Sequence, residues 1–170
     1  MKDLQNIILI GFMGAGKSTV GRHLAAALNW KFIDTDSMIE EVTAMTVSDI
    51  FRRYGEDRFR FEESLVVKKV CSNRNCVIST GGGTVMNPEN LALLKQSGVV
   101  IYLYASLEEI LKRVGSSERP LLKRSPEEVL LLWQSRQKTY AQAHYTVDTT
   151  NMGVEEAAKE ILRLLKEGVY

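Results

Sequence analysis

Short apolar runs alternate along the chain with longer stretches in which apolar residues recur at helical spacing. The runs are rich in β-branched and aromatic residues, which favour strands. Strands that alternate with helices predict an α/β fold of three layers, with a parallel sheet flanked by helices. The five predicted strands cover residues 7–10, 32–33, 77–78, 99–103 and 145–147.

Several helix boundaries are marked by residues that satisfy free backbone groups. Ser-x-x-Glu patterns, typical of capping boxes, begin at Ser37, Ser106 and Ser125. Pro follows both Asn87 and Ser125, at what would be the first helical position. Gly98 is a candidate helix end. These signals place helices between the predicted strands.

Composition limits the classes of protein to be considered. The 170 residues are 45% hydrophobic, which suits one domain, residues 1–170, with its own core. The 22 Lys and Arg balance the 21 Asp and Glu, so no overall field favours nucleic acid or an acidic membrane. Cys71 and Cys76 fit neither a zinc site nor a disulfide framework. We therefore expect a cytoplasmic monomer with reduced thiols and without a nucleic-acid or membrane partner.

The strongest local signal follows the first predicted strand, where residues 11–18 read Gly-x-x-x-x-Gly-Lys-Ser. Glycines let backbone N–H groups surround phosphate oxygens, because no Cβ atom obstructs the approach. The following helix adds its positive end, and Lys17 adds charge. A glycine-rich turn that only joined strand to helix would not explain Lys17 and Ser18 at this spacing. The motif predicts nucleoside triphosphate binding. The residues expected to contact the nucleotide are Gly14, Ala15, Gly16, Lys17, Ser18 and Thr19.

Two carboxylates, Asp34 and Asp36, follow the second predicted strand. Ligands of open parallel sheets bind beyond the carboxyl ends of strands, where the predicted phosphate loop also lies. We expect Ser18 to ligate the Mg²⁺ that accompanies the triphosphate and Asp34 to bind it through water. Asp36 would accept hydrogen bonds from substrate hydroxyls, and orient or deprotonate the attacking one. The alternative, that these carboxylates only cap a helix, is disfavoured because Ser37 is a better cap.

Two further segments have more than one interpretation. Residues 81–83, three consecutive glycines, follow the third strand and either form a flexible turn or let a substrate ring lie against bare backbone. Residues 112–125 include a polar, basic stretch between two helical patterns. Long loops are usually functional or disordered, so this stretch is either a disordered loop or a lid. A lid would exclude water and bring an arginine to the transferring phosphoryl group.

Together these motifs resemble the shikimate kinase family over nearly the whole chain. The phosphate loop includes the Phe-Met-Gly variant of that family. Many nucleotide-binding proteins share the loop alone, whereas the ordered set is specific. The other matching motifs are Phe-Ile-Asp34-Thr-Asp36, Phe59-Arg60-x-x-Glu63, Gly81-Gly82-Gly83, Arg119-Pro120-Leu121-Leu122 and Arg136-x-x-x-Tyr140.

The resemblance implies transfer of the γ-phosphoryl group of ATP to the 3-hydroxyl of shikimate, with Mg²⁺ as the metal ion. It also implies a fold like that of nucleoside monophosphate kinases, with strand order 2-3-1-4-5. Catalysis would rest on Lys17, Asp36 and Arg119, of which Arg119 lies on the lid and reaches the phosphates. For the adenine we expect contacts with Lys112 and with the stretch near Asn151. The residues that the resemblance implies for shikimate binding are Asp36, Arg60, Gly82 and Arg136.

Two other functions stay open. A kinase for another polyol acid, such as gluconate, would need the same phosphate loop and similar acceptor groups. A non-catalytic nucleotide-binding domain would be recognised by the loss of Lys17, Asp36 or Arg136, and all three are present. Shikimate itself suits these residues, because a guanidinium can bind its carboxylate while Asp36 binds its hydroxyls.

Overall fold

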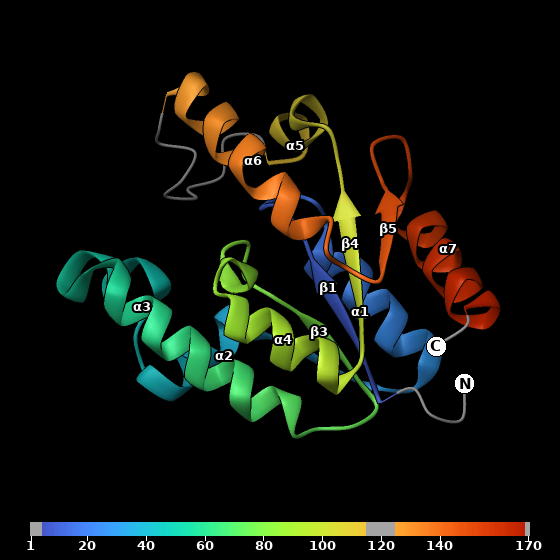
Figure 1. Ribbon diagram of the computed structural model, residues 1–170, viewed down its shortest axis with the longest axis horizontal. Coiled ribbons are helices and arrows are strands. Elements are labelled where there is room, and N and C mark those ends of the chain that lie inside the picture. The colour runs from blue at the N-terminus through green and yellow to red at the C-terminus, as the bar shows by residue number, and fades with distance from the viewer. Residues whose placement is uncertain (1–4, 115–124, 169–170) are drawn as a thin grey trace.

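A five-stranded parallel sheet forms the centre of the structure, a computed structural model that describes residues 5–114 and 125–168 (Figure 1). The strand order is β2-β3-β1-β4-β5, which confirms the predicted fold. Every strand extends the predicted run by one residue at one or both ends. The strands are β1 (Asn6–Ile10), β2 (Lys31–Asp34), β3 (Cys76–Ser79), β4 (Val99–Tyr104) and β5 (Tyr145–Asp148).

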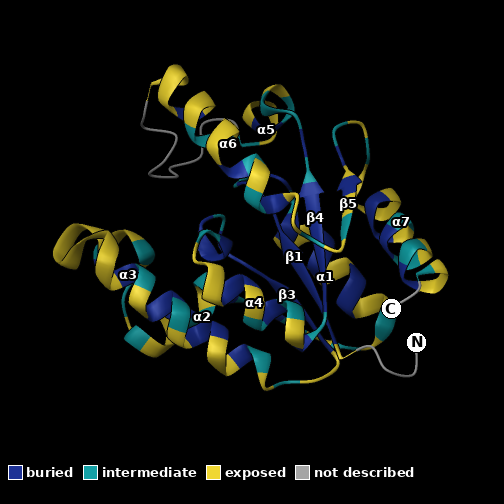
Figure 2. Cartoon of the chain, in the orientation of Figure 1, coloured by how far each residue is buried: buried dark blue, intermediate teal, exposed yellow. Residues whose placement is uncertain are grey.

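Helices cover both faces of the sheet. Alternate residues of β1 point to opposite faces: Ile7 and Leu9 pack with α1 and α7, whereas Ile8 and Ile10 pack with the layer that contains α3 and α4. Figure 2 shows the central strands buried and the outer helix surfaces exposed. The helical elements are α1 (Lys17–Leu28), α2 (Thr35–Thr43), α3 (Val47–Cys71), the 3₁₀ turn η1 (Thr84–Met86), α4 (Pro88–Ser97), α5 (Leu107–Val114), α6 (Pro126–Tyr140) and α7 (Val154–Glu167).

Most of the predicted helix caps are present. The Ser125 hydroxyl accepts from the N–H of Glu128 at 3.2 Å, and the Glu128 carboxylate accepts from the N–H of Ser125 at 2.8 Å, which completes a capping box. The prediction that Ser37 caps a helix is wrong. Helix α2 begins earlier, at Thr35, because Asp34 accepts from the N–H groups of Asp36 and Ser37.

The cysteines and the length of the helices bear on two expectations from composition. Cys71 and Cys76 are both free, and burial raises the pKa of each thiol, so both stay protonated near neutral pH. Among the helices of residues 5–114 and 125–168, none is long and apolar enough to cross a membrane.

Candidate active site

The loop between β1 and α1 has the geometry of a phosphate-binding loop. Gly14 and Gly16 have φ angles of 76° and 91°, in the left-handed region that favours glycine. A Cβ atom on Gly14 would collide with the side chain of Val114 on α5. Gly16 caps α1 without a side chain, and the first turn of α1 has no acidic residue. The N–H groups at this helix end are therefore available to an anion.

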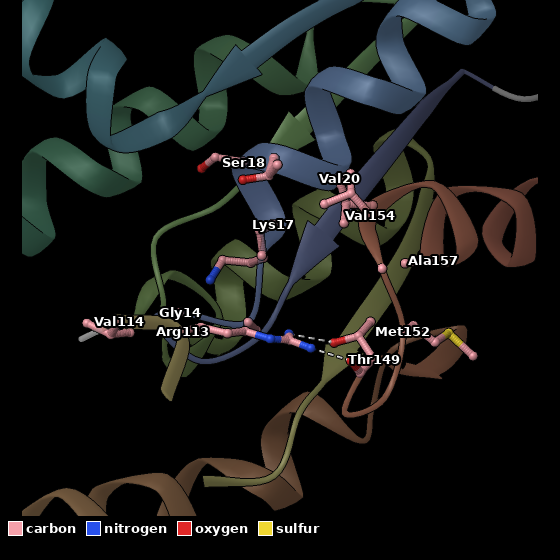
Figure 3. A pocket seen from close by; sticks show the side chains of 14 residues that line it. Gly14, Lys17, Ser18, Val20, Arg113, Val114, Thr149, Met152, Val154 and Ala157 are labelled. Carbon is pink, nitrogen blue, oxygen red and sulfur yellow. Dashed lines mark hydrogen bonds between the residues drawn. The ribbon is translucent and has the colours of Figure 1, made fainter. Parts of the chain in front are cut away.

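Lys17 folds back over this loop. Its Nζ atom donates to the carbonyl of Gly11 at 2.8 Å and to that of Phe12 at 2.9 Å. The residue is only 8% exposed, so the backbone carbonyls replace much of the water around the ammonium group. The positive charge of Lys17 therefore lies beside the loop, next to the place where a phosphate would bind (Figure 3).

Ser18 and Asp34 lie together, as the expected metal site requires. The Ser18 hydroxyl donates to Oδ2 of Asp34 at 2.7 Å and lies 3.3 Å from the hydroxyl of Ser79. The other oxygen, Oδ1, caps α2, so Asp34 has a structural role that the sequence argument had assigned to Ser37. Hydroxyl and carboxylate oxygens are ligands that suit Mg²⁺. The described residues contain no group of three or more His, Cys, Asp or Glu that could hold a metal.

A cavity of about 560 Å³ opens beside the phosphate loop. Its far wall is formed by Arg113 on α5 and by Thr149 after β5 (Figure 3). The Arg113 guanidinium donates to the hydroxyl of Thr149 at 3.1 Å and also to its carbonyl. The cavity therefore extends from the phosphate loop to the wall formed by Arg113 and Thr149. It offers space for a nucleoside attached to phosphates bound at the loop. The other lining residues outside the loop are Val114, Met152, Gly153, Val154 and Ala157.

The expected stretch near Asn151 contributes Thr149 and Met152 to the cavity wall, but on α5 sequence reasoning missed Arg113 and expected Lys112 instead. Lys112 does not line the cavity, and its ammonium pairs with Glu108 at 2.8 Å on an exposed surface. The buried Ile110 and the cavity-lining Val114 lie on the inner side of α5, and Arg113 adjoins them. This helical periodicity is the signal that could have favoured Arg113 over its neighbour.

The predicted acceptor residues Asp36 and Arg136 come together at the glycine loop, residues 81–83. Oδ1 of Asp36 and Nη1 of Arg136 are buried and have no hydrogen-bond partner in the part of the chain that the structure describes. A Cβ atom on Gly81 would lie 2.6 Å from Oδ1 of Asp36, and one on Gly82 would lie 3.4 Å from Nη1 of Arg136. Both polar atoms therefore lie against bare backbone, although α2 and α6 are far apart in sequence. A buried polar group without a partner is costly, and a ligand can supply that partner.

Arg60 approaches the same loop from α3. Its Nη1 atom donates to Oε2 of Glu63 at 2.8 Å, and a Cβ atom on Gly83 would collide with its guanidinium. Oε1 of Glu63 accepts from the hydroxyl of Thr84 at 2.6 Å. The carboxylate of Glu63 thus holds Arg60 beside the glycine loop. Glu56 also accepts from Arg60, at 3.0 Å, but its side chain is 60% exposed.

Burial is the main reason why the pKa of Asp36 rises to about 6, and the carboxylates of Asp34 and Glu63 raise it further. Lys17 acts in the opposite direction and lowers this pKa. Asp36 is therefore largely ionised at neutral pH but more basic than an ordinary aspartate. A carboxylate with these properties can accept a hydrogen bond or a proton from a hydroxyl group.

The predicted lid lies mostly outside the described residues. Residues 115–124, with Arg119, are not described. Of the remainder, Lys112 to Val114 form the last turn of α5, and Ser125 caps α6.

A parallel sheet with this strand order, a phosphate loop after its first strand and paired acceptor groups at the same edge define a P-loop kinase for a small molecule. The sequence model of the family described as shikimate kinase matches residues 13–166. The chain belongs to the shikimate kinase family.

Individual relatives agree with this assignment. A shikimate kinase from Pelotomaculum thermopropionicum is 49% identical over 98% of this chain and 99% of its own length. The solved structure of a shikimate kinase from Acinetobacter baumannii in complex with shikimate has a TM-score of 0.93 and 40% identity, and covers 97% of this chain and 94% of its own.

The alternative of gluconate as the acceptor is not favoured by these relatives. A gluconokinase from Sinorhizobium meliloti has a TM-score of 0.63 and 18% identity, and covers 96% of this chain and 92% of its own. That likeness concerns the fold alone.

Proposed function

We propose that the enzyme transfers the γ-phosphoryl group of ATP to the 3-hydroxyl of shikimate, which gives shikimate 3-phosphate and ADP. The observation that carries this proposal is the pair of unpartnered atoms at the glycine loop, Oδ1 of Asp36 and Nη1 of Arg136. The Asp36 oxygen needs a hydrogen-bond donor, and the Arg136 nitrogen needs an acceptor. Shikimate has hydroxyl groups to donate and a carboxylate to accept.

On the acceptor side, we assign the shikimate carboxylate to Arg136 and Arg60. Arg136 is buried and has a free Nη1 atom, while Arg60 is held in place by Glu63. Asp36 would accept the substrate hydroxyl, and the backbone of Gly82 would let the substrate ring approach closely. Such positioning of two reactants can supply about 7 to 11 kcal/mol of the barrier reduction in favourable systems.

In the transfer step, the substrate oxygen bonds to the γ-phosphorus while the bond from the γ-phosphorus to the β,γ-bridging oxygen breaks. The hydroxyl proton passes to Oδ1 of Asp36, whose raised pKa favours this acceptance. Lys17 and the N-terminus of α1 stabilise the charge on the phosphoryl group. ADP leaves with the bridging oxygen.

Ser18 and Asp34 are the residues that would hold Mg²⁺, because their oxygens lie 2.7 Å apart at the edge of the phosphate loop. When bound, this ion neutralises charge on the β- and γ-phosphates. Asp34 would bind the ion through water, and its carboxylate is held in orientation because Oδ1 accepts from two N–H groups of the first turn of α2.

Two further roles complete the proposal. Arg113 and Thr149 form the wall that would face the nucleoside, because they line the cavity opposite the phosphate loop. Arg119 would reach the phosphates from a lid, an assignment supported by its place in the Arg119-Pro120-Leu121-Leu122 motif.

A coupled assay for ADP with purified protein, ATP and Mg²⁺ tests the proposal. We expect turnover with shikimate, none above background with gluconate, and a new phosphomonoester signal in the ³¹P spectrum. Turnover of gluconate but not shikimate would overturn the choice of acceptor. ATP binding without transfer to either acid would favour a non-catalytic nucleotide-binding domain.

A further inference from the structure

Tyr140 is a buried side chain that has no role in the reaction described above. It ends α6, its side chain is 0% exposed, and its hydroxyl lies 2.5 Å from the carbonyl oxygen of Gly82. Burial raises the pKa of Tyr140 to about 12, so the hydroxyl keeps its proton and donates. This hydrogen bond joins α6 to the glycine loop, 58 residues away in sequence.

The Gly82 carbonyl differs from its two neighbours in how it is satisfied. The carbonyl of Gly81 accepts from the N–H of Thr84 at 3.2 Å, and that of Gly83 accepts from the N–H of Met86 at 3.0 Å. Both of these bonds stay within the loop and η1. The carbonyl of Gly82, in contrast, is held from another element of the fold.

Holding this carbonyl also fixes the next amide. A trans peptide is planar, so the N–H of Gly83 points opposite to the carbonyl of Gly82. Glycines without side chains otherwise allow the peptide plane to rotate. Among the described residues, neither the N–H of Gly82 nor that of Gly83 has a hydrogen-bond acceptor. Tyr140 thus orients the N–H of Gly83, which remains available to a ligand.

Tyr140 also adjoins Arg136, one helical turn earlier on α6. The Arg136 guanidinium lies close enough to lower the pKa of Tyr140, although burial has the larger, opposite effect. The same guanidinium lies 5.7 Å from the centre of the Phe12 ring, and a Cβ atom on Gly82 would be 3.4 Å from its Nη1 atom. Gly82, Arg136 and Tyr140 therefore form one contiguous unit.

We infer that Tyr140 is a positioning residue for the acceptor: its hydroxyl holds the Gly82 peptide and the Arg136 guanidinium in the relative placement that shikimate binding requires. The inference rests on the proposed function, because it assumes that Gly82 and Arg136 bind shikimate. In this role Tyr140 does not contact the substrate itself and acts through Gly82 and Arg136, which do.

The test compares Tyr140→Phe with a matched control, Tyr102→Phe. The two rings pack together with their centres 5.0 Å apart, and both residues are buried. The Tyr102 hydroxyl donates to Gln137 at 2.6 Å rather than to the glycine loop. Each substitution removes one hydroxyl from the same aromatic cluster. A purely structural role would give both variants the same kinetic effect.

We expect Tyr140→Phe to raise the KM for shikimate about tenfold, equivalent to about 1.4 kcal/mol. The KM for ATP and kcat should change less than about threefold, since the phosphate loop is untouched. Tyr102→Phe should leave the KM for shikimate within about twofold of wild type. Its melting temperature should fall by about as much as that of Tyr140→Phe. All proteins are assayed well below the lowest melting midpoint, so that unfolding does not imitate weak binding.

Replacement of Tyr140 by 4-aminophenylalanine restores a donor at the same position. We expect it to return the KM for shikimate to within about threefold of wild type. The inference is overturned if Tyr140→Phe leaves this KM unchanged, if it raises the KM values for shikimate and ATP equally, or if the amino group does not rescue binding. Wild-type protein that fails to phosphorylate shikimate overturns the proposed function instead.

Discussion

The phosphate loop and the acceptor site lie at the same edge of the sheet but are built differently. The loop lies within residues 11–18, and Lys17 bonds to carbonyls of that same segment. The acceptor site takes side chains from α2, α3 and α6, and it leaves Oδ1 of Asp36 and Nη1 of Arg136 without partners among the described residues. The phosphate loop is thus built from one contiguous segment, whereas the acceptor site is assembled from three helices and leaves two buried polar atoms for a ligand. The two sites should respond differently to substitution.

Lys17→Ala should give the largest effect. We expect kcat to fall about 10³-fold, because the ammonium stabilises charge that develops on the transferring phosphoryl group. Lys166→Ala, an exposed lysine on α7, is the control and should keep wild-type kcat. If Lys17→Ala lowered kcat by less than about tenfold, Lys17 would not have the catalytic role assigned to it.

Asp36→Asn should lower kcat/KM for shikimate about 10²-fold or more, because the amide accepts hydrogen bonds weakly and cannot take a proton. Asp57→Asn, an exposed carboxylate on α3, is the control for loss of one negative charge. Near-normal turnover by Asp36→Asn would contradict both an orienting and a basic role for this carboxylate.

The same Asp36→Asn substitution should stabilise the protein in the absence of nucleotide and Mg²⁺. The folded pKa of about 6 exceeds the ordinary value of 3.8, so folding favours the protonated form and ionisation costs stability. This cost is absent near pH 3.5, grows as the pH rises towards 6, and reaches about 1 to 3 kcal/mol near pH 7. Thermal unfolding of wild type and variant should diverge over that interval. A constant difference between pH 4 and pH 7 would contradict this account.

Arg136→Ala should chiefly weaken shikimate binding. We expect the KM for shikimate to rise about 10²-fold, the range for loss of a buried partner of a carboxylate, with little change in the KM for ATP. Arg136→Lys keeps the charge but not the planar fork, and should recover only part of the binding. Equal effects on the KM values for both substrates would contradict the assignment.

Glu63→Gln and Glu56→Gln give the smallest expected effects and compare two partners of Arg60. The side chain of Glu63 is 1% exposed and that of Glu56 is 60% exposed. We expect the KM for shikimate to rise about fivefold to tenfold for Glu63→Gln and less than about twofold for Glu56→Gln. The reverse order would mean that the exposed pair, not the buried one, positions Arg60.

The difference between the two sites also explains what could be predicted from the sequence. The phosphate loop is a contiguous motif, and alternation of strands and helices gave the parallel sheet. Asp36 was predicted from its place after the second strand, whereas Arg136 was identified only through resemblance to a family, because periodicity alone gives no reason for α6 to meet the glycine loop. The start of α2 was predicted too late, because Asp34 at the end of β2 already accepts from the N–H groups of Asp36 and Ser37.

Arg113 and Tyr140 show the other limit of sequence reasoning. Arg113 lies beside Lys112, and only the orientation of α5 decides which of them lines the cavity. Tyr140 belongs to a recognised motif, but its bond to the Gly82 carbonyl depends on how α6 packs against the sheet. Helical periodicity could have favoured Arg113, whereas no local pattern contains the contact between Tyr140 and Gly82.

Calorimetric titration of shikimate into nucleotide-free Lys17→Ala tests the central claim most directly, with wild type and Arg136→Ala measured alongside. If the acceptor site is built separately from the phosphate loop, Lys17→Ala should bind shikimate within about threefold of the wild-type Kd, whereas Arg136→Ala should lose about 10²-fold. Loss of shikimate binding in Lys17→Ala as large as that in Arg136→Ala would contradict the account.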